Sequence, residues 1–154
     1  MRPIGLRLPI GGFMVSQQRS EPRDPYATPS TESLTALVHG FYGDVRADPL
    51  LGPVFEEALR DRWEPHLARM VDFWSTVALG SRTFSGNVFG KHMALSGVTP
   101  AHFTVWVRLW GQHTDALFAP DVAQHLQTTA YGIARNLFQG YFGVRPDFSH
   151  REPA

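Results

Sequence analysis

Two histidines on predicted inward faces are the side chains best suited to chemistry in this sequence. His66 opens an apolar helical face that continues through Met70 and Phe73. His92 lies in a short segment beside Met93. A single histidine on such a face is usually a hydrogen-bonded core residue. Two histidines on successive segments, facing an interior rich in aromatic rings, would grip a planar cofactor from both sides through their ring nitrogens.

Tyr42 and Trp106 would add hydrogen-bond donors to the same interior. Each combines an apolar ring with one polar group, and both lie on predicted inward faces of other helices. The alternative is that they are core aromatics whose O–H and N–H groups find backbone acceptors. The other histidines fit structural or exposed positions: the partly buried His113, His102 and His125 at stripe edges, the solvated His39 and the terminal His150.

Helical spacing of apolar residues runs through the central chain and predicts an all-α fold. The first helix follows Ser30, a suitable N-cap, and stops at Asp48–Pro49. Residues 50–55 predict a tight turn, followed by one helical turn through Leu59. Further helices are expected at residues 65–79, 88–95, 100–117 and 120–138.

The composition excludes several classes of protein. A chain of 154 residues with 43% hydrophobic and 18% charged residues is long enough for one domain with a sizeable core. Its formal net charge of +0 argues against nucleic acid as a main partner. Because the sequence has no cysteine, it holds no disulfide, zinc finger, iron–sulfur cluster or cysteine nucleophile.

Common catalytic and membrane signatures are also missing. The sequence has no zincin, phosphate-loop, nucleophile-elbow or EF-hand motif, and no set of histidines and carboxylates at helical ligand spacing in one stripe. No stretch approaches the roughly 18–20 consecutive apolar residues that span a bilayer. Composition predicts a flexible arm at 1–30, a folded body at 31–142 and a flexible tail at 143–154. We expect a cytoplasmic protein with no membrane partner.

Four short blocks carry a resemblance to a known family. In chain order they are FYGDVRADPLLGPVF, WEPHLARMVDFWSTVALG, GKHMAL and HFTVWVRLWGQ. Their order and joint occurrence resemble the truncated haemoglobins, specifically the branch called group III, over residues 31–142. The resemblance implies a shortened two-over-two globin-like helical sandwich around haem b.

The resemblance implies roles for the residues on each side of the haem. His92 matches the proximal ligand of the iron. Phe41, Tyr42 and Trp106 match the distal, ligand-facing side, where Tyr42 and Trp106 are the pair of donors. His66 matches the distal position that faces the sixth coordination site, where it would gate ligand access, donate to the ligand or bind the iron directly.

A second set of positions resembles those that hold the porphyrin in the family. Side chains expected to pack on it are Phe55, Met70, Phe73, Trp74 and Phe89. Lys91 and Arg82 would pair with the haem propionates. Met70 is a departure, because the family often has a branched aliphatic residue at that position.

Together these roles imply a haem b protein that binds O₂ and other diatomic ligands at a five-coordinate iron with a polar distal pocket. Such a pocket suits ligand binding or the chemistry of reactive oxygen and nitrogen species. One alternative is a haem-dependent enzyme, peroxidase-like or a nitric-oxide dioxygenase, that needs an unidentified reductase. Another is a helical module without a cofactor. The sequence leaves the oligomeric state open.

Overall fold

The computed structural model describes residues 28–81, 86 and 88–148, without the side chains of Val88 and Phe89. These residues form helices and no strand, so the predicted all-α class is confirmed. The helices are α2 (Thr31–Ala47), α3 (Leu51–Leu59), α4 (Trp63–Leu79), α5 (Val88–Met93), α6 (Pro100–Leu117) and α7 (Pro120–Phe142). None of the described helices is long and apolar enough to cross a membrane.

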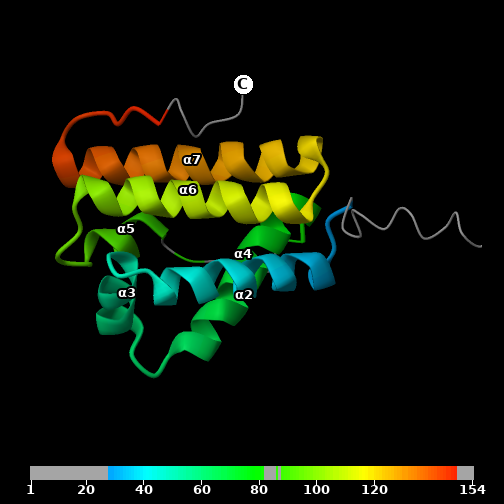
Figure 1. Cartoon of the computed structure of the whole chain (residues 1–154), viewed down its shortest axis with the longest axis horizontal. Coiled ribbons are helices and arrows are strands. Elements are labelled where there is room, and N and C mark those ends of the chain that lie inside the picture. Colours follow the sequence, from blue (N-terminus) through cyan, green and yellow to red (C-terminus); the bar gives the residue numbers. More distant parts are fainter. Residues whose placement is uncertain (1–27, 82–85, 87, 149–154) are drawn as a thin grey trace, which may run out of the picture.

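The helices form two layers of two. The antiparallel helices α6 and α7 lie side by side, and α2 packs against α4 beneath them (Figure 1). Helix α2 also contacts α6, which joins the two layers, while the shorter α3 and α5 lie at the same end of the molecule (Figure 1). This arrangement leaves a space between the layers that the short helices help to close.

Local sequence signals explain most of the helix boundaries. Ser30 and Ser33 form a reciprocal capping box at the start of α2, with each hydroxyl accepting from the other residue's backbone N–H at 3.1 and 2.8 Å. Helix α4 ends at Gly80, whose φ of 69° lies in the left-handed region that favours glycine. Pro100 occupies the first turn of α6, where its missing N–H costs nothing.

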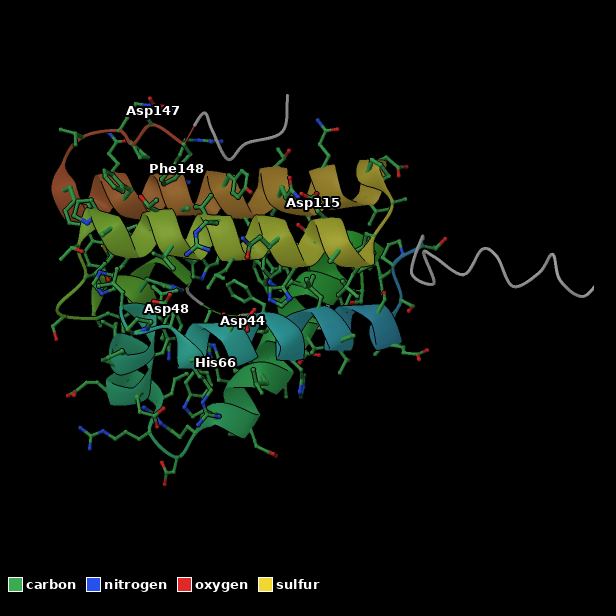
Figure 2. All side chains as sticks on the ribbon, in the orientation of Figure 1. Asp44, Asp48, His66, Asp115, Asp147 and Phe148 are labelled. Carbon is green, nitrogen blue, oxygen red and sulfur yellow. The ribbon has the colours of Figure 1, made fainter. Side chains whose placement is uncertain are left out.

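Helix α3 corrects the predicted tight turn at residues 50–55, because it is helical from Leu51 onward. The side chain of Asp48 accepts the backbone N–H groups of Leu50 and Leu51 at 2.8 and 2.9 Å, which satisfies donors at the start of the helix. Figure 2 shows Asp48 at the corner between α2 and α3. Gly52 permits this corner, since a Cβ there would lie 2.7 Å from the carbonyl oxygen of Arg46.

The core between the layers is built largely from aromatic rings. Trp110, only 1% exposed, stacks on Trp74 with ring centroids 4.5 Å apart and on Trp106 at 6.1 Å. Phe148 is also buried and meets Phe138 of α7 edge-on at 6.1 Å, so the chain folds back along α7 after Gly143 (Figure 2). Phe148 therefore corrects the expectation of a tail that is flexible throughout.

Candidate functional site

A cavity of about 490 Å³ lies between the helical layers, within the size range of small-molecule sites. All six described helices contribute to its wall, which is mainly apolar. The structure brings to this wall nine of the side chains singled out in the sequence: Tyr42, Phe55, His66, Met70, Phe73, Trp74, Lys91, His92 and Trp106. Residues separated by as many as 64 positions thus meet at one cavity.

Three polar side chains from three helices line this wall. Tyr42 comes from α2, His66 from α4 and Trp106 from α6. The rings of Tyr42 and His66 are perpendicular, with an interplanar angle of 87° and centroids 5.1 Å apart. This edge-to-face contact holds two potential hydrogen-bonding groups beside each other without a bond between them.

Burial makes both Tyr42 and His66 neutral at ordinary pH. It raises the pKa of Tyr42 well above the usual range for a tyrosine, so its hydroxyl stays protonated and can donate. The pKa of His66 is lowered to about 4 by burial first, and then by positive charge on His92 and Arg69. Among the described side chains, Nε2 of His66 is a buried polar atom with no hydrogen-bond partner. A ligand in the cavity could supply that partner.

His92 reaches the cavity from the short helix α5, which packs mainly on α7. The carbonyl oxygen of His92 accepts a hydrogen bond from the Tyr141 hydroxyl of α7 and another from the backbone N–H of Leu95 at 3.0 Å. These bonds tie the last turn of α5 at the residue that carries the imidazole. The positive charge on His92 lowers the pKa of His66, which indicates that the two imidazoles share one electrostatic environment.

Three basic side chains also line the cavity: Arg62, Arg69 and the exposed Lys91. Arg62 donates from Nη2 to the carbonyl oxygen of Ala58 at 2.7 Å, which directs its guanidinium along α3. Apolar walls with cations at exposed positions suit a ligand that is mostly apolar and carries acidic groups at one edge.

Phe41 does not belong to the cavity wall, which corrects its assignment to the distal site. It is fully buried and makes edge contacts with the rings of Trp106 at 5.6 Å and Trp110 at 5.0 Å. Successive helical residues point about 100° apart, so Phe41 faces α6 while Tyr42 faces the cavity. Arg82 and the side chain of Phe89 lie outside the described residues.

Several residues of the wall were not identified as site residues from the sequence, among them His102 and Tyr141. His102, expected at a stripe edge, is only 8% exposed and lines the cavity. Its Nδ1 lies 3.0 Å from the backbone nitrogen and 2.8 Å from Oγ1 of Thr99, so a capping role at the start of α6 turns it inward. Tyr141 follows Leu137 by four residues on α7, and that spacing is a signal for a shared helix face.

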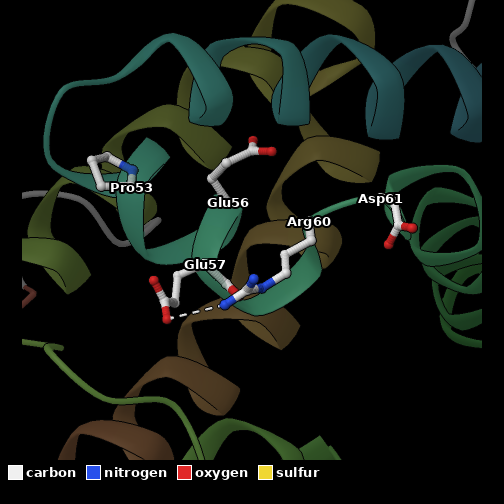
Figure 3. Close-up of a pocket in the computed structure, with 5 residues that line it drawn as sticks. All are labelled: Pro53, Glu56, Glu57, Arg60 and Asp61. Atoms are coloured by element: carbon white, nitrogen blue, oxygen red, sulfur yellow. Dashed lines mark hydrogen bonds and ion pairs between the residues drawn. The ribbon is translucent and has the colours of Figure 1, made fainter.

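A second, open pocket lies on the outer side of α3 and is lined by Pro53, Glu56, Glu57, Arg60 and Asp61 (Figure 3). In this pocket Glu57 and Arg60 form an exposed ion pair, with Oε2 of Glu57 and Nη2 of Arg60 3.5 Å apart (Figure 3). No group of three or more potential metal-ligating side chains occurs among the described residues. The cavity between the layers is therefore the candidate site.

Comparison with known proteins agrees with this architecture. No family model matches the chain. A group 3 truncated haemoglobin of Campylobacter jejuni is 27% identical over 124 residues, which cover 77% of this chain and 98% of that protein. The crystal structure of group III truncated haemoglobin from Campylobacter jejuni matches with a TM-score of 0.72 and 26% identity, over 76% of this chain and 94% of that one. In both sequence and fold, this chain is similar to the group III truncated haemoglobins.

Proposed function

We propose that the cavity between the layers binds haem b and that the chain uses it to bind O₂ and other diatomic ligands. Similarity to the group III truncated haemoglobins supports globin-type ligand binding. The observation that carries the proposal is a mainly apolar cavity of about 490 Å³ that receives the imidazoles of both His66 and His92.

The residues of the wall fit a porphyrin. Phe55, Met70, Phe73 and Trp74 offer apolar surface to the macrocycle, and they also keep water away from it. The cationic Arg62, Arg69 and Lys91 match the two acidic propionates by charge. Arg62 and Arg69 add to Lys91, one of the two basic residues that the sequence suggested for this role; the other, Arg82, lies outside the described residues.

His92 would hold the iron through a ring nitrogen, as the proximal ligand. The bound haem would supply an iron with one open position for a diatomic molecule. The hydrogen bonds from Tyr141 and Leu95 to the His92 carbonyl would keep its backbone in place beneath the iron. A neutral imidazole is the form that binds a metal.

Tyr42, Trp106 and His66 would form the opposite, ligand-facing wall. Tyr42 is a donor at all ordinary pH values because burial raises its pKa, and the indole N–H of Trp106 can only donate. His66 is neutral above pH about 4 and lines the cavity beside Tyr42, which suits a gate for the ligand. We therefore propose a five-coordinate iron with His66 as a gate.

Replacement of His92 tests the proposed haem site. We expect His92→Ala to abolish stable haem uptake and His92→Gly to bind haem only when free imidazole replaces the missing ring. Absorbance in the Soret region, with haem quantified per chain, measures both. The matched control is His125→Ala, because His125 is exposed on α7 and is not part of the wall. A normal Soret band and full stoichiometry in His92→Ala would refute the proximal assignment.

A further inference from the structure

Trp63, the first residue of α4, lies behind the cavity rather than in its wall. It is only 6% exposed, yet it is not one of the lining residues. Its indole contacts three rings that do line the cavity: it stacks on Phe55 at 6.2 Å and 25°, and it meets Tyr42 and His66 edge-on, each at 6.2 Å. Trp63 therefore touches the polar part of the wall from outside.

Two charged side chains hold the other side of the Trp63 indole. Its Nε1–H donates to Oε1 of Glu56 on α3 at 3.2 Å. The guanidinium of Arg46 on α2 lies 4.3 Å from the ring centroid, in a cation–π contact, and 3.8 Å from the same carboxylate oxygen. Figure 3 shows Glu56 turned toward α2, whereas the neighbouring Glu57 pairs with Arg60.

The ring of His66 needs such support because hydrogen bonds do not orient it through Nε2, which has no partner. Packing against neighbouring rings then helps to fix its direction. Tyr42 and Trp63 both meet the imidazole at 87°, so the ring lies between two perpendicular aromatic contacts. Trp63 precedes His66 by three residues, which places both side chains on one face of the first turn of α4.

We propose that Trp63 is the positioning residue of the ligand-facing wall: gripped by Arg46 and Glu56, its indole fixes the ring of His66 against Tyr42. The placement of the imidazole stands on the contacts described above, and only its consequence at the iron rests on the proposed function. The contacts of Trp63 with Arg46 and Glu56 join helices α2, α3 and α4. Loss of the indole, or of its contacts with Arg46 and Glu56, frees the imidazole to rotate.

Three variants separate this role from simple packing. Trp63→Phe keeps an apolar ring but removes the Nε1–H donor and shortens the reach to His66. Glu56→Ala leaves the indole intact and removes its acceptor, at a side chain that is 55% exposed. The matched control is Glu57→Ala, which deletes the same charge from the same helix but a side chain that pairs with Arg60 instead.

The decisive measurement is the infrared stretch of CO bound to the ferrous, haem-loaded full chain, because its frequency reports the polar groups beside the ligand. We expect Trp63→Phe to change the ratio of CO bands by roughly two- to tenfold, the effect of losing one aromatic contact. Glu56→Ala should change the same ratio, because the indole loses the acceptor that holds it. Glu57→Ala should reproduce the wild-type spectrum. A structural role alone would lower the melting temperature without changing the bands.

Wild-type bands in both Trp63→Phe and Glu56→Ala, when His66→Leu does shift them, would overturn the proposal. A wild-type chain that takes up no haem would instead defeat the proposed function. In that case, nuclear Overhauser contacts between the rings of His66 and Tyr42 in the purified chain decide the inference. Their loss in Trp63→Phe supports it, and their retention refutes it.

Discussion

At the scale of single residues, burial shifts two pKa values in opposite directions and leaves both groups uncharged. It raises the pKa of Tyr42, an acid, and lowers the pKa of His66, a base. The indole of Trp106, which also lines the cavity, carries no charge either. These three side chains can therefore offer hydrogen bonds to a small ligand while remaining neutral, whereas the charge of the wall comes from Arg62, Arg69 and Lys91.

Removal of the Tyr42 hydroxyl should speed the release of O₂. A hydrogen bond to a charged partner contributes about 1.5–3 kcal/mol, so Tyr42→Phe is expected to raise the O₂ dissociation rate by roughly ten- to a hundredfold. Stopped-flow measurement on the haem-loaded chain gives that rate. Tyr131→Phe is the matched control, since this tyrosine is buried on α7 away from the cavity wall. An unchanged rate in Tyr42→Phe would remove its donor from ligand stabilisation.

How far single residues could be predicted depends on what turns each one inward. His66 and Met70 lie on a regular apolar stripe, so their place in the cavity wall followed from spacing. His102 could not be placed in this way, because its capping contact with Thr99 depends on the local backbone. Phe41 was assigned with its neighbour Tyr42, although helical geometry sends adjacent side chains in different directions. The proposed roles of these residues toward haem stay predictions.

At the scale of helices, α5 depends on α7. Its six residues are too few to pair most of their own backbone groups, and a helix of this length has little stability by itself. The hydroxyl of Tyr141 supplies a donor to one of its last carbonyl groups, at His92. The backbone that carries the His92 imidazole is thus tied to the final turns of a different helix.

Replacement of Tyr141 by phenylalanine should loosen α5 while sparing the rest of the fold. Loss of one hydrogen bond is expected to weaken local protection by about 0.5–1.5 kcal/mol. Amide hydrogen exchange across His92–Leu95 measures this change, with the amides of α6 as the internal reference. If the protection of His92–Leu95, measured relative to α6, is the same in the wild type and in Tyr141→Phe, the hydroxyl does not restrain α5.

Helix boundaries were predictable where a capping residue lies next to the helix. Ser30 and Thr99 both begin helices as expected. The start of helix α3 was predicted too late because Leu50, at its N-cap position, has no capping side chain. The stabilising carboxylate belongs to Asp48, two residues earlier, and Gly52 must also approach the backbone of Arg46. That approach is a tertiary contact, and apolar spacing does not report it.

At the scale of the whole molecule, the cavity exists only when all the described helices are in place, since each contributes to its wall. Folding therefore buries His66 in an environment that no single helix creates. Tyr42 on α2, Arg69 on α4 and His92 on α5 are the titratable or charged groups that face it. The linkage between folding and protonation follows from this shared burial.

The stability of the chain without added haem should fall as the pH drops from about 6.5 to about 4. In this window the unfolded chain protonates His66, whereas the folded chain does not until its lowered pKa is reached. The cost is about 1–2 kcal/mol, allowing for solvent screening of a partly exposed ring. Denaturant unfolding at several pH values measures it. His66→Leu should flatten this part of the profile, and an identical slope in the variant would contradict the linkage.

The stacked indoles have a practical consequence for spectroscopy. The chain has four tryptophans: Trp74 and Trp106 lie in the cavity wall, Trp110 stacks on both, and Trp63 lies directly behind. The intrinsic tryptophan fluorescence therefore originates entirely from indoles in or next to the cavity. A chromophore that enters it will quench emission from every indole at once, so a simple titration of the unlabelled protein can count occupied sites.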